Sequence, residues 1–201
     1  MTEQNIPEQY TGVSVDVVSE SAAGSVERAK IVYGMMQSRL LEVNRWQEFS
    51  GKKMAKFTLY DRGGNPVFRP VEIGDYFRIE IPAPDNESGN GDDWVEVQTI
   101  VFDTDEKEPG TIITVKPVSC PLNSKDGVAH FLSDEASSTF IVRRSSDRVF
   151  AEVHGRNEKP NVKDVDLKEK IRNTLVTTGS VIGFSKLQWK LLTDGIINFE
   201  E

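Results

Sequence analysis

Cysteine and histidine, the residues on which redox and metal chemistry most often depends, are almost missing from this sequence. One cysteine, Cys120, and two histidines, His130 and His154, occur among 201 residues. A single cysteine excludes a disulfide within the chain, and the residue spacings typical of zinc sites are absent. The glycine-rich loops that bind phosphates and dinucleotides are missing as well. We therefore expect no metal and no cofactor.

Long apolar runs and an excess of positive charge are also missing. No apolar run approaches the roughly 20 residues of a membrane-spanning helix, and the N-terminal residues lack the basic start and apolar core of a signal peptide. Asp and Glu number 32 against 24 Lys and Arg, which gives a formal charge of −8 at pH 7. This charge disfavours nucleic acid and anionic membrane surfaces as partners. We expect a cytoplasmic protein with no membrane insertion and no nucleic-acid partner.

The aromatic residues are numerous enough for a packed core, with ten Phe, four Tyr and three Trp. A chain of 201 residues is long enough for one sizeable domain. Residues 1–11 are polar and contain Pro7, so we expect them to form a flexible leader. A single α+β domain is expected over residues 12–201.

The first part of the domain predicts a strand followed by a helix. Val13, Val15 and Val17 alternate with the residues between them, which is typical of a short half-buried strand. Ser25 is suited to cap a helix that runs to about Leu41. The apolar face of that helix recurs at three- and four-residue spacing and consists of Val26, Ala29, Val32, Tyr33, Met36 and Leu40.

The middle of the chain changes to an apolar period of two, which is typical of strands. The clearest case is the stretch from Tyr76 to Ile81, where every second residue is a large apolar one. About seven consecutive short strands joined by turns favour an antiparallel meander over alternating strands and helices. The expected strands cover residues 57–59, 67–70, 76–81, 94–102, 111–115, 128–132, 139–144 and the residues from 149 onward.

After residue 160 the pattern returns to a helical period, and two consecutive helices are expected. The first is a long helix with an apolar stripe from Leu167 to Ile182. The second begins at a capping box formed by Ser185 and Gln188 and ends at Gly195.

The order of these elements, a strand, helices, an antiparallel meander and a long C-terminal helix, resembles the helix-grip architecture of the START-like (Bet v 1-like) superfamily. The resemblance covers residues 13 to about 189 and lies in element order alone. It implies that a curved sheet wraps the terminal helix and leaves a cavity between them. The expected fold class is α+β, an antiparallel meander sheet of about seven strands with N-terminal helices and a long C-terminal helix packed on it. The alternative is a small β-barrel with flanking helices, because residues 71–76 and 94–97 resemble the opening of an SH3-like barrel.

The stretch from residue 149 to residue 161 begins as a strand and ends in a polar turn. Side chains two apart on a strand share a face. Glu152, His154 and Arg156 therefore point one way, and the apolar side chains at 149, 151 and 153 point the other. Two orientations stay open: the charged side chains lie on a solvent-facing surface, or they line the cavity.

If the charged side chains line a cavity, they offer specific chemistry. Arg156 could bind a carboxylate or phosphate with its fork of donors. Glu152 could hold one nitrogen of His154 so that the other nitrogen serves as a base or ligand. The two histidines and a glutamate show no metal-binding spacing, so no metal site is assigned. The candidate ligand-binding residues are Glu152, His154, Arg156, Asn157, Glu158 and His130.

The expected function is that of a small-molecule binding protein whose ligand is anionic or amphipathic and occupies an apolar cavity between the sheet and the C-terminal helix. The alternative is a structural, assembly or protein-interaction module built on the β-barrel. The third hypothesis is an enzyme that uses Glu152 and His154 for acid–base chemistry, which the lack of a nucleophile and a cofactor motif disfavours. The partner is then a small molecule or a protein, and assembly into a homo-oligomer stays open.

Overall fold

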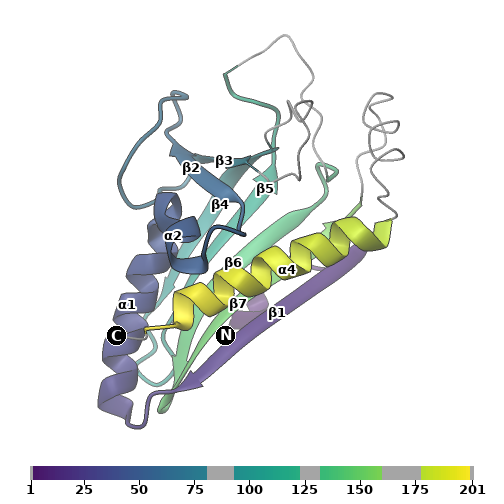
Figure 1. Ribbon diagram of the computed structural model, residues 1–201. Helices are drawn as coiled ribbons and strands as arrows, with labels where there is room; N and C mark the ends of the chain where they lie inside the picture. Colours follow the sequence, from purple (N-terminus) through teal and green to yellow (C-terminus); the bar gives the residue numbers. More distant parts are fainter. Residues whose placement is uncertain (1, 81–92, 123–131, 160–177, 200–201) are drawn as a thin grey trace.

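A computed structural model of the protein describes residues 2–80, 93–122, 132–159 and 178–199. Within these ranges, seven strands form one sheet, which three α-helices accompany (Figure 1). The strands are β1 (Val13–Ala22), β2 (Lys56–Tyr60), β3 (Tyr76–Glu80), β4 (Asp93–Asp103), β5 (Gly110–Pro117), β6 (Ser137–Ser145) and β7 (Arg148–Glu158). The helices are α1 (Val26–Leu41), α2 (Trp46–Ser50) and α4 (Thr178–Ile197), with short 3-10 helices η1 (Thr2–Asn5) and η2 (Val43–Arg45).

The strands are ordered β1-β7-β6-β5-β4-β3-β2, so the first strand of the chain lies beside the last. Every neighbouring pair is antiparallel. β1 and β2 are the two edges of an open sheet, so the expected α+β fold is confirmed and the alternative of a small β-barrel is wrong. Residues 67–70 were expected to form a strand and do not, whereas the expected strand at 128–132 lies largely outside the described residues.

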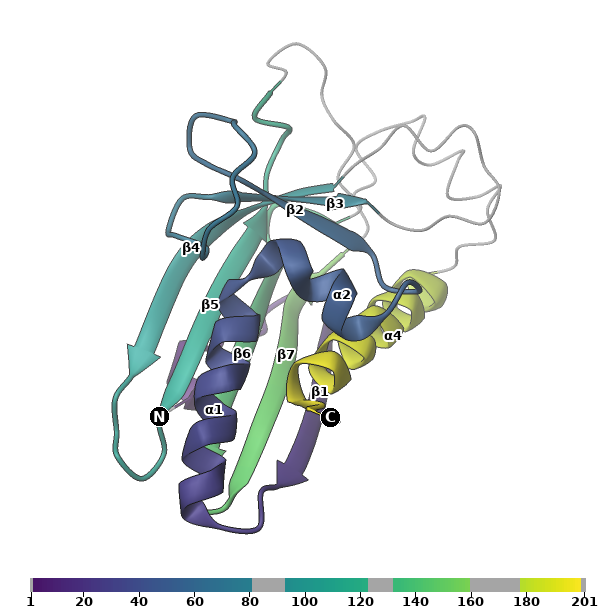
Figure 2. The ribbon, with the colours of Figure 1, turned by 60° about the vertical axis from the view of Figure 1, so that its left-hand side comes forward.

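The helices α1 and α4 lie across the same face of the sheet, with α4 over β1 and β7 (Figures 1 and 2). α1 begins where the sequence predicts, because Ser25 Oγ accepts a hydrogen bond from the backbone N–H of Arg28 at 3.1 Å. Aromatic rings pack between sheet and helices: the ring centroid of Trp46 lies 5.0 Å from that of Phe57 and 4.9 Å from that of Phe140. The helix-facing side of the sheet therefore carries the hydrophobic core.

The C-terminal helix differs from the sequence-based expectation of two helices. α4 is continuous from Thr178 to Ile197, so the capping box expected at Ser185 is wrong. Gln188 instead joins α4 to the segment before β2. Its Oε1 accepts a hydrogen bond from the backbone N–H of Ala55 at 2.6 Å, and its Nε2 donates to the carbonyl of Lys53 at 3.1 Å. The part of the expected first helix that precedes residue 178 lies outside the described residues.

Gly195 does not end α4 but allows the helix to approach α2 closely. A Cβ atom added at position 195 would lie 2.6 Å from the carbonyl oxygen of Phe49. Only glycine fits that approach without a shift of the backbone, which explains a glycine inside a helix. None of the helices within the described ranges is long and apolar enough to cross a membrane.

The end of β7 holds the N-terminal segment. Asn157 Oδ1 accepts hydrogen bonds from the backbone N–H groups of Tyr10 at 2.9 Å and Thr11 at 3.1 Å, and Asn157 Nδ2 donates to the carbonyl of Glu8 at 3.0 Å. Preceding this segment, η1 lies behind the sheet, away from α1 and α4 (Figure 2). The flexibility expected for residues 1–11 stays a prediction.

Candidate functional site

The charged side chains of β7 face away from α1 and α4. The core on the helix-facing side includes three residues of this strand, Val149, Ala151 and Val153. Neighbouring residues in a strand point to opposite faces, so Glu152, His154 and Arg156 lie on the outer face of the sheet. The hypothesis that these three residues line an inner cavity is therefore not what the structure shows. Even so, Glu152 and His154 are each only 8% exposed.

These side chains belong to an outer charge network whose members are Asp16, Arg143, Glu152, His154 and Arg156. The two ring nitrogens of His154 both contact carboxylates: Nδ1 lies 2.6 Å from Asp16 Oδ1, and Nε2 lies 2.9 Å from Glu152 Oε2. Arg143 Nε donates to Glu152 Oε1 at 2.6 Å. Arg156 Nη2 lies 2.8 Å from Asp16 Oδ1. The network thus connects β1, β7 and β6, and its position follows from the register that pairs Asp16 with His154.

The carboxylates determine the protonation of His154. Burial by itself lowers the pKa of the His154 imidazole, but hydrogen bonds to Glu152 and Asp16 and their negative charges outweigh burial, so this pKa is raised. Burial by itself raises the pKa of Glu152, yet His154 and Arg143 hold it below its usual value. The pKa of Asp16 is lowered in the same way, because His154 and Arg156 outweigh burial. Each charged form is therefore stabilised by its neighbours.

An imidazole held between two carboxylates donates from both nitrogens and has no free lone pair to accept a proton or bind a metal. The contact that the sequence suggested between Glu152 and His154 is present. However, Asp16 takes the second nitrogen, which the enzyme hypothesis reserved for catalysis. Within the described ranges, no group of His, Cys, Asp and Glu residues is arranged to hold a metal ion. The chemistry that this geometry supports best is an electrostatic link between β1 and β7.

Glu158 lies on the other side of the sheet from this network. Gly155 follows Val153 by two residues and so faces the helices, and a Cβ added to Gly155 would overlap the Glu158 carboxylate. Glu158 is only 3% exposed, and its Oε2 has no hydrogen-bond partner among the residues that the structure describes. Burial raises the pKa of Glu158 to about 7, although the charge of Arg156 acts against this shift.

Asn157 and Glu158, the remaining predicted residues that the structure describes, do not join the outer charge network. Asn157 holds the backbone of residues 8–11, and His130 lies outside the described residues, so its place relative to His154 is untested. A ligand-binding role for the six predicted residues stays a prediction. Asp16 was missed because the alternation of β1 signals a strand but does not reveal which strand pairs with it.

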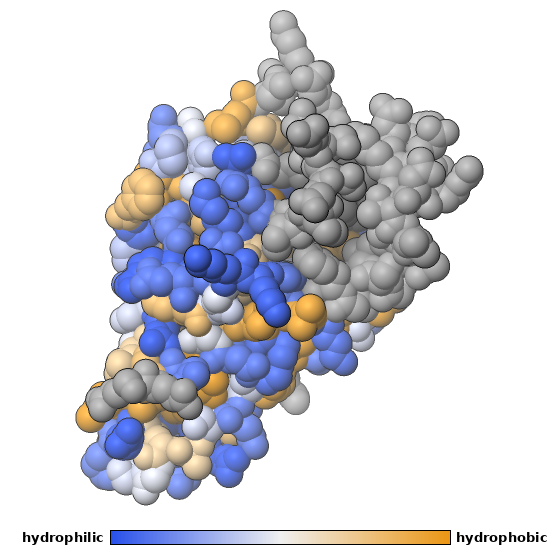
Figure 3. Space-filling view, viewed as in Figure 1, coloured by the Kyte–Doolittle hydropathy of each residue, from blue (hydrophilic) through white to orange (hydrophobic). Residues whose placement is uncertain are grey.

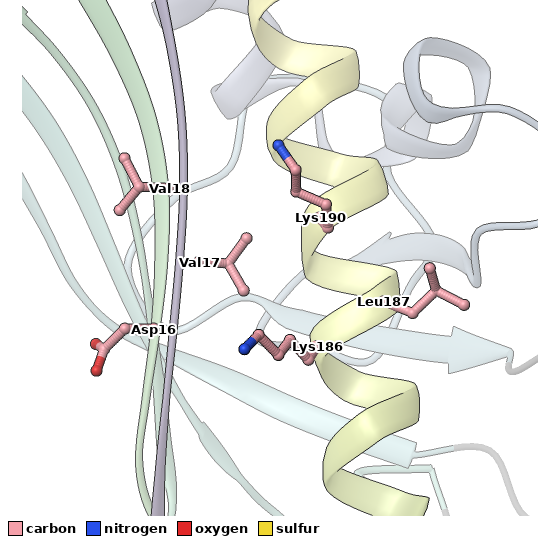
Figure 4. A pocket seen from close by; sticks show the side chains of 6 residues that line it. All are labelled: Asp16, Val17, Val18, Lys186, Leu187 and Lys190. Carbon is pink, nitrogen blue, oxygen red and sulfur yellow. The ribbon is translucent and has the colours of Figure 1, made fainter.

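A groove of about 400 Å³ lies between the free edge of β1 and α4, and we name it the β1–α4 groove. Its lining residues are Asp16, Val17, Val18, Lys186, Leu187 and Lys190. Figure 4 shows Val17 pointing toward α4 and both lysine side chains extending from α4 toward β1. Val18 and Leu187 are 48% and 57% exposed, and Figure 4 shows Val18 pointing away from α4 and Leu187 pointing away from β1. Figure 3 shows hydrophilic and hydrophobic residues intermixed over the face that carries α4.

The two lysines of the groove differ in their partners. Lys190 Nζ lies 2.6 Å from Asp194 Oδ1 and donates to Ser19 Oγ at 2.9 Å. Lys186 is exposed and has no hydrogen-bond or ion-pair partner among the described residues. Sequence reasoning missed both, although lysines four apart share one face of a helix and could have been noticed.

No family model matches the sequence, and no curated protein matches it. Several solved structures match most of this chain. A hypothetical protein from Helicobacter pylori shares 12% identity with a TM-score of 0.50, over 93% of this chain and 87% of that chain. Truncated norcoclaurine synthase from Thalictrum flavum shares 13% identity with a TM-score of 0.39, over 92% and 98%. A major latex-like protein from Panax ginseng shares 13% identity with a TM-score of 0.36, over 86% and 97%.

The likeness to the Helicobacter pylori protein concerns the fold alone, because 12% identity is too low to carry a function. The class that the coordinates define is an α+β protein of helix-grip architecture, in which an open antiparallel sheet is crossed by one C-terminal helix. The likeness assigns no particular family within that class.

Proposed function

We propose that this protein binds a small amphipathic molecule with an anionic group in the β1–α4 groove. The observation that carries the proposal is the combination of the apolar side chain of Val17, which points toward α4, with a lysine, Lys186, that has no partner among the described residues. The volume of about 400 Å³ falls within the roughly 300–1,000 Å³ of small-molecule sites.

The charge of the groove contrasts with that of the whole chain. The chain carries a formal charge of −8, yet two of the six residues that line the groove are lysines. The only acidic residue of the lining, Asp16, is paired with Arg156 and His154 on the outer face. A ligand anion would therefore meet a local excess of positive charge, which favours both its approach and its retention.

The packing of the interior also favours a ligand site at the edge of the sheet over one beneath the helices. Among the described residues, the helix-facing side of the sheet is occupied by the aromatic cluster around Trp46, with Phe57, Phe77 and Phe140 in contact with its ring. Side chains at native density leave little room for a guest at that point. The edge of β1 beside α4, where the groove lies, is the more favourable place.

Titration with the fluorescent amphiphile anilinonaphthalene sulfonate tests the proposal. Replacing Lys186 with glutamine removes an exposed charge contact worth about 1 kcal/mol, so the Kd should rise about fivefold. The double variant Val18→Ser/Leu187→Ser replaces the two exposed apolar residues beside the groove with polar ones, and burying about 40 Å² at each position would contribute about 1 kcal/mol per position. Its Kd should therefore rise by more than tenfold.

Lys107→Gln provides the matched control, because Lys107 is exposed in the turn between β4 and β5. It changes the net charge by the same amount as Lys186→Gln but lies outside the groove lining. The proposal fails if the two lysine variants bind the amphiphile with the same affinity. It also fails if the double variant Val18→Ser/Leu187→Ser retains the affinity of the wild type. A binding site for an extended protein segment would then be the hypothesis to pursue.

A further inference from the structure

Asp194 neutralises one of the two lysines of the β1–α4 groove. Its Oδ1 lies 2.6 Å from Lys190 Nζ and 2.6 Å from the hydroxyl of Ser19 on β1. The Ser19 hydroxyl also lies 2.8 Å from Thr193 Oγ1. Ser19 and Thr193 are 5% and 1% exposed, so this end of the groove is anchored in the interface between strand and helix.

This anchoring holds Lys190 in place. A lysine at four-residue spacing from an aspartate on an exposed helix normally gains little from the pair. Here the ammonium group has a second partner, because it also donates to Ser19 Oγ at 2.9 Å. A ligand that recruited Lys190 would have to separate it from Asp194 and Ser19 together. Lys186 has no such tie among the residues described.

The net charge of the groups around the groove sets how much negative charge a ligand can bring into it. Lys190 and Asp194 cancel one another, and Asp16 is balanced by Arg156, to which it lies at 2.8 Å. The charge left over is the single positive charge of Lys186. A monoanion is neutralised by one cation, whereas a dianion would retain one uncompensated charge beside Asp194.

We infer that the β1–α4 groove selects monoanionic amphiphiles, such as carboxylates or sulfonates, against dianionic ones such as phosphate monoesters. Lys186 is the contact for the ligand anion, and Lys190 is a positioning residue that links α4 to β1. This inference rests on the proposed function, because it names the charge class of the ligand at the same site.

The test compares dodecanoate with dodecyl phosphate by calorimetric titration at about pH 8, where the phosphate is a dianion. Asp194→Asn keeps an oxygen acceptor for Lys190 and Ser19 but removes the negative charge. One charge changes affinity about fivefold per ligand charge when it acts through water at close range. Dodecanoate should therefore bind about fivefold more tightly to this variant and dodecyl phosphate about 25-fold more tightly. The ratio of the two affinities then shifts about fivefold toward the phosphate.

Three further variants separate selection by Asp194 from a direct role of Lys190 and control for impaired folding and for net charge. The double variant Lys190→Gln/Asp194→Asn has the net charge of the wild type, and it should bind both amphiphiles with wild-type affinities. Asp194→Glu restores the charge and should return the wild-type ratio, which guards against an effect of impaired folding. Glu106→Gln removes an exposed acid in the turn between β4 and β5 and should leave both affinities unchanged.

The inference is overturned if Asp194→Asn leaves the ratio of affinities unchanged. It is also overturned if the double variant loses as much affinity for dodecanoate as Lys186→Gln does, since Lys190 would then contact the ligand directly. If the wild type binds neither amphiphile, or Lys186→Gln has no effect on either, the proposed function fails and the inference fails with it.

Discussion

Replacing Glu152 with glutamine removes one negative charge from the outer charge network and leaves the size of the side chain unchanged. In the wild type, Glu152 accepts from Arg143 at 2.6 Å and contacts His154 at 2.9 Å. The substitution leaves Arg143 and His154 without the carboxylate that they share. Glu152 itself is only 8% exposed, so water cannot readily replace that carboxylate. We therefore expect a clear loss of folding stability.

The magnitude follows from how deeply each partner is buried. Removing one member of a fully buried ion pair costs about 3–5 kcal/mol. The Arg143 side chain is 27% exposed, so water compensates part of its loss, and we expect about 2–3 kcal/mol. Asp16 is 50% exposed on its side chain, and Asp16→Asn should cost only about 0.5–1 kcal/mol.

The effect of Glu152→Gln should also depend on pH in a defined direction. The pKa of His154 is raised in the folded state, so its protonation stabilises the fold fully below the unfolded value of 6.5. That contribution is lost as the pH rises above 6.5 and passes through the raised folded pKa. The variant lacks the main acceptor for the His154 proton. The difference in stability between wild type and variant should therefore be larger at pH 6 than at pH 9.

Urea denaturation followed by tryptophan fluorescence measures this difference at each pH. Taking the difference between two proteins cancels the titration of groups that the substitution does not touch. The interpretation of the network is refuted if Glu152→Gln costs no more than Asp16→Asn. It is equally refuted if the difference between wild type and variant is the same at pH 6 and pH 9.

Two further predictions concern folding. Gly195→Ala should destabilise the protein by about 1–2 kcal/mol in urea titrations, because overlap with Phe49 outweighs the roughly 1 kcal/mol that alanine gains inside a helix; a stabilised variant would contradict this packing. Glu158→Gln should stabilise the protein at pH 8 by about 1–3 kcal/mol and have little effect near pH 4. The pKa of Glu158 is raised from 4.5 to about 7, so its ionisation costs stability as the pH rises through that window. Thermal melts that show no growing difference between pH 4 and pH 8 would contradict this sign.

Elements whose signals are local could be predicted from the sequence. α1 begins directly after its capping serine, Ser25, and ends at Leu41 as the apolar stripe indicates, because both signals are local in the sequence. The boundaries of α4 could not be predicted in this way. Gln188 resembles a capping residue, but its partner Ala55 lies 133 positions away in the sequence, and Gly195 is required by a contact with α2.

In the candidate site, too, the features with local sequence signals could be predicted and those that depend on distant contacts could not. The alternation along β7 correctly groups Glu152, His154 and Arg156 on one face, since this grouping needs only the period of a strand. Which face turns toward α4 depends on pairing with β1, and the Asp16–His154 contact spans 138 positions. The β1–α4 groove likewise joins residues from the two ends of the chain, so the two lysines could be seen in the sequence but the groove could not.

Covalent mapping of the ligand position tests the central claim most directly. A dodecanoate analogue with a photoactivatable group on its chain can be cross-linked to the wild-type protein, and the modified peptides can then be identified by mass spectrometry. We predict cross-links to residues 16–18 of β1 and residues 186–190 of α4. Their yield should fall strongly in Lys186→Gln and stay at the wild-type level in Lys107→Gln. Cross-links concentrated on the outer face around His154, or spread equally over the surface, would contradict binding in the β1–α4 groove.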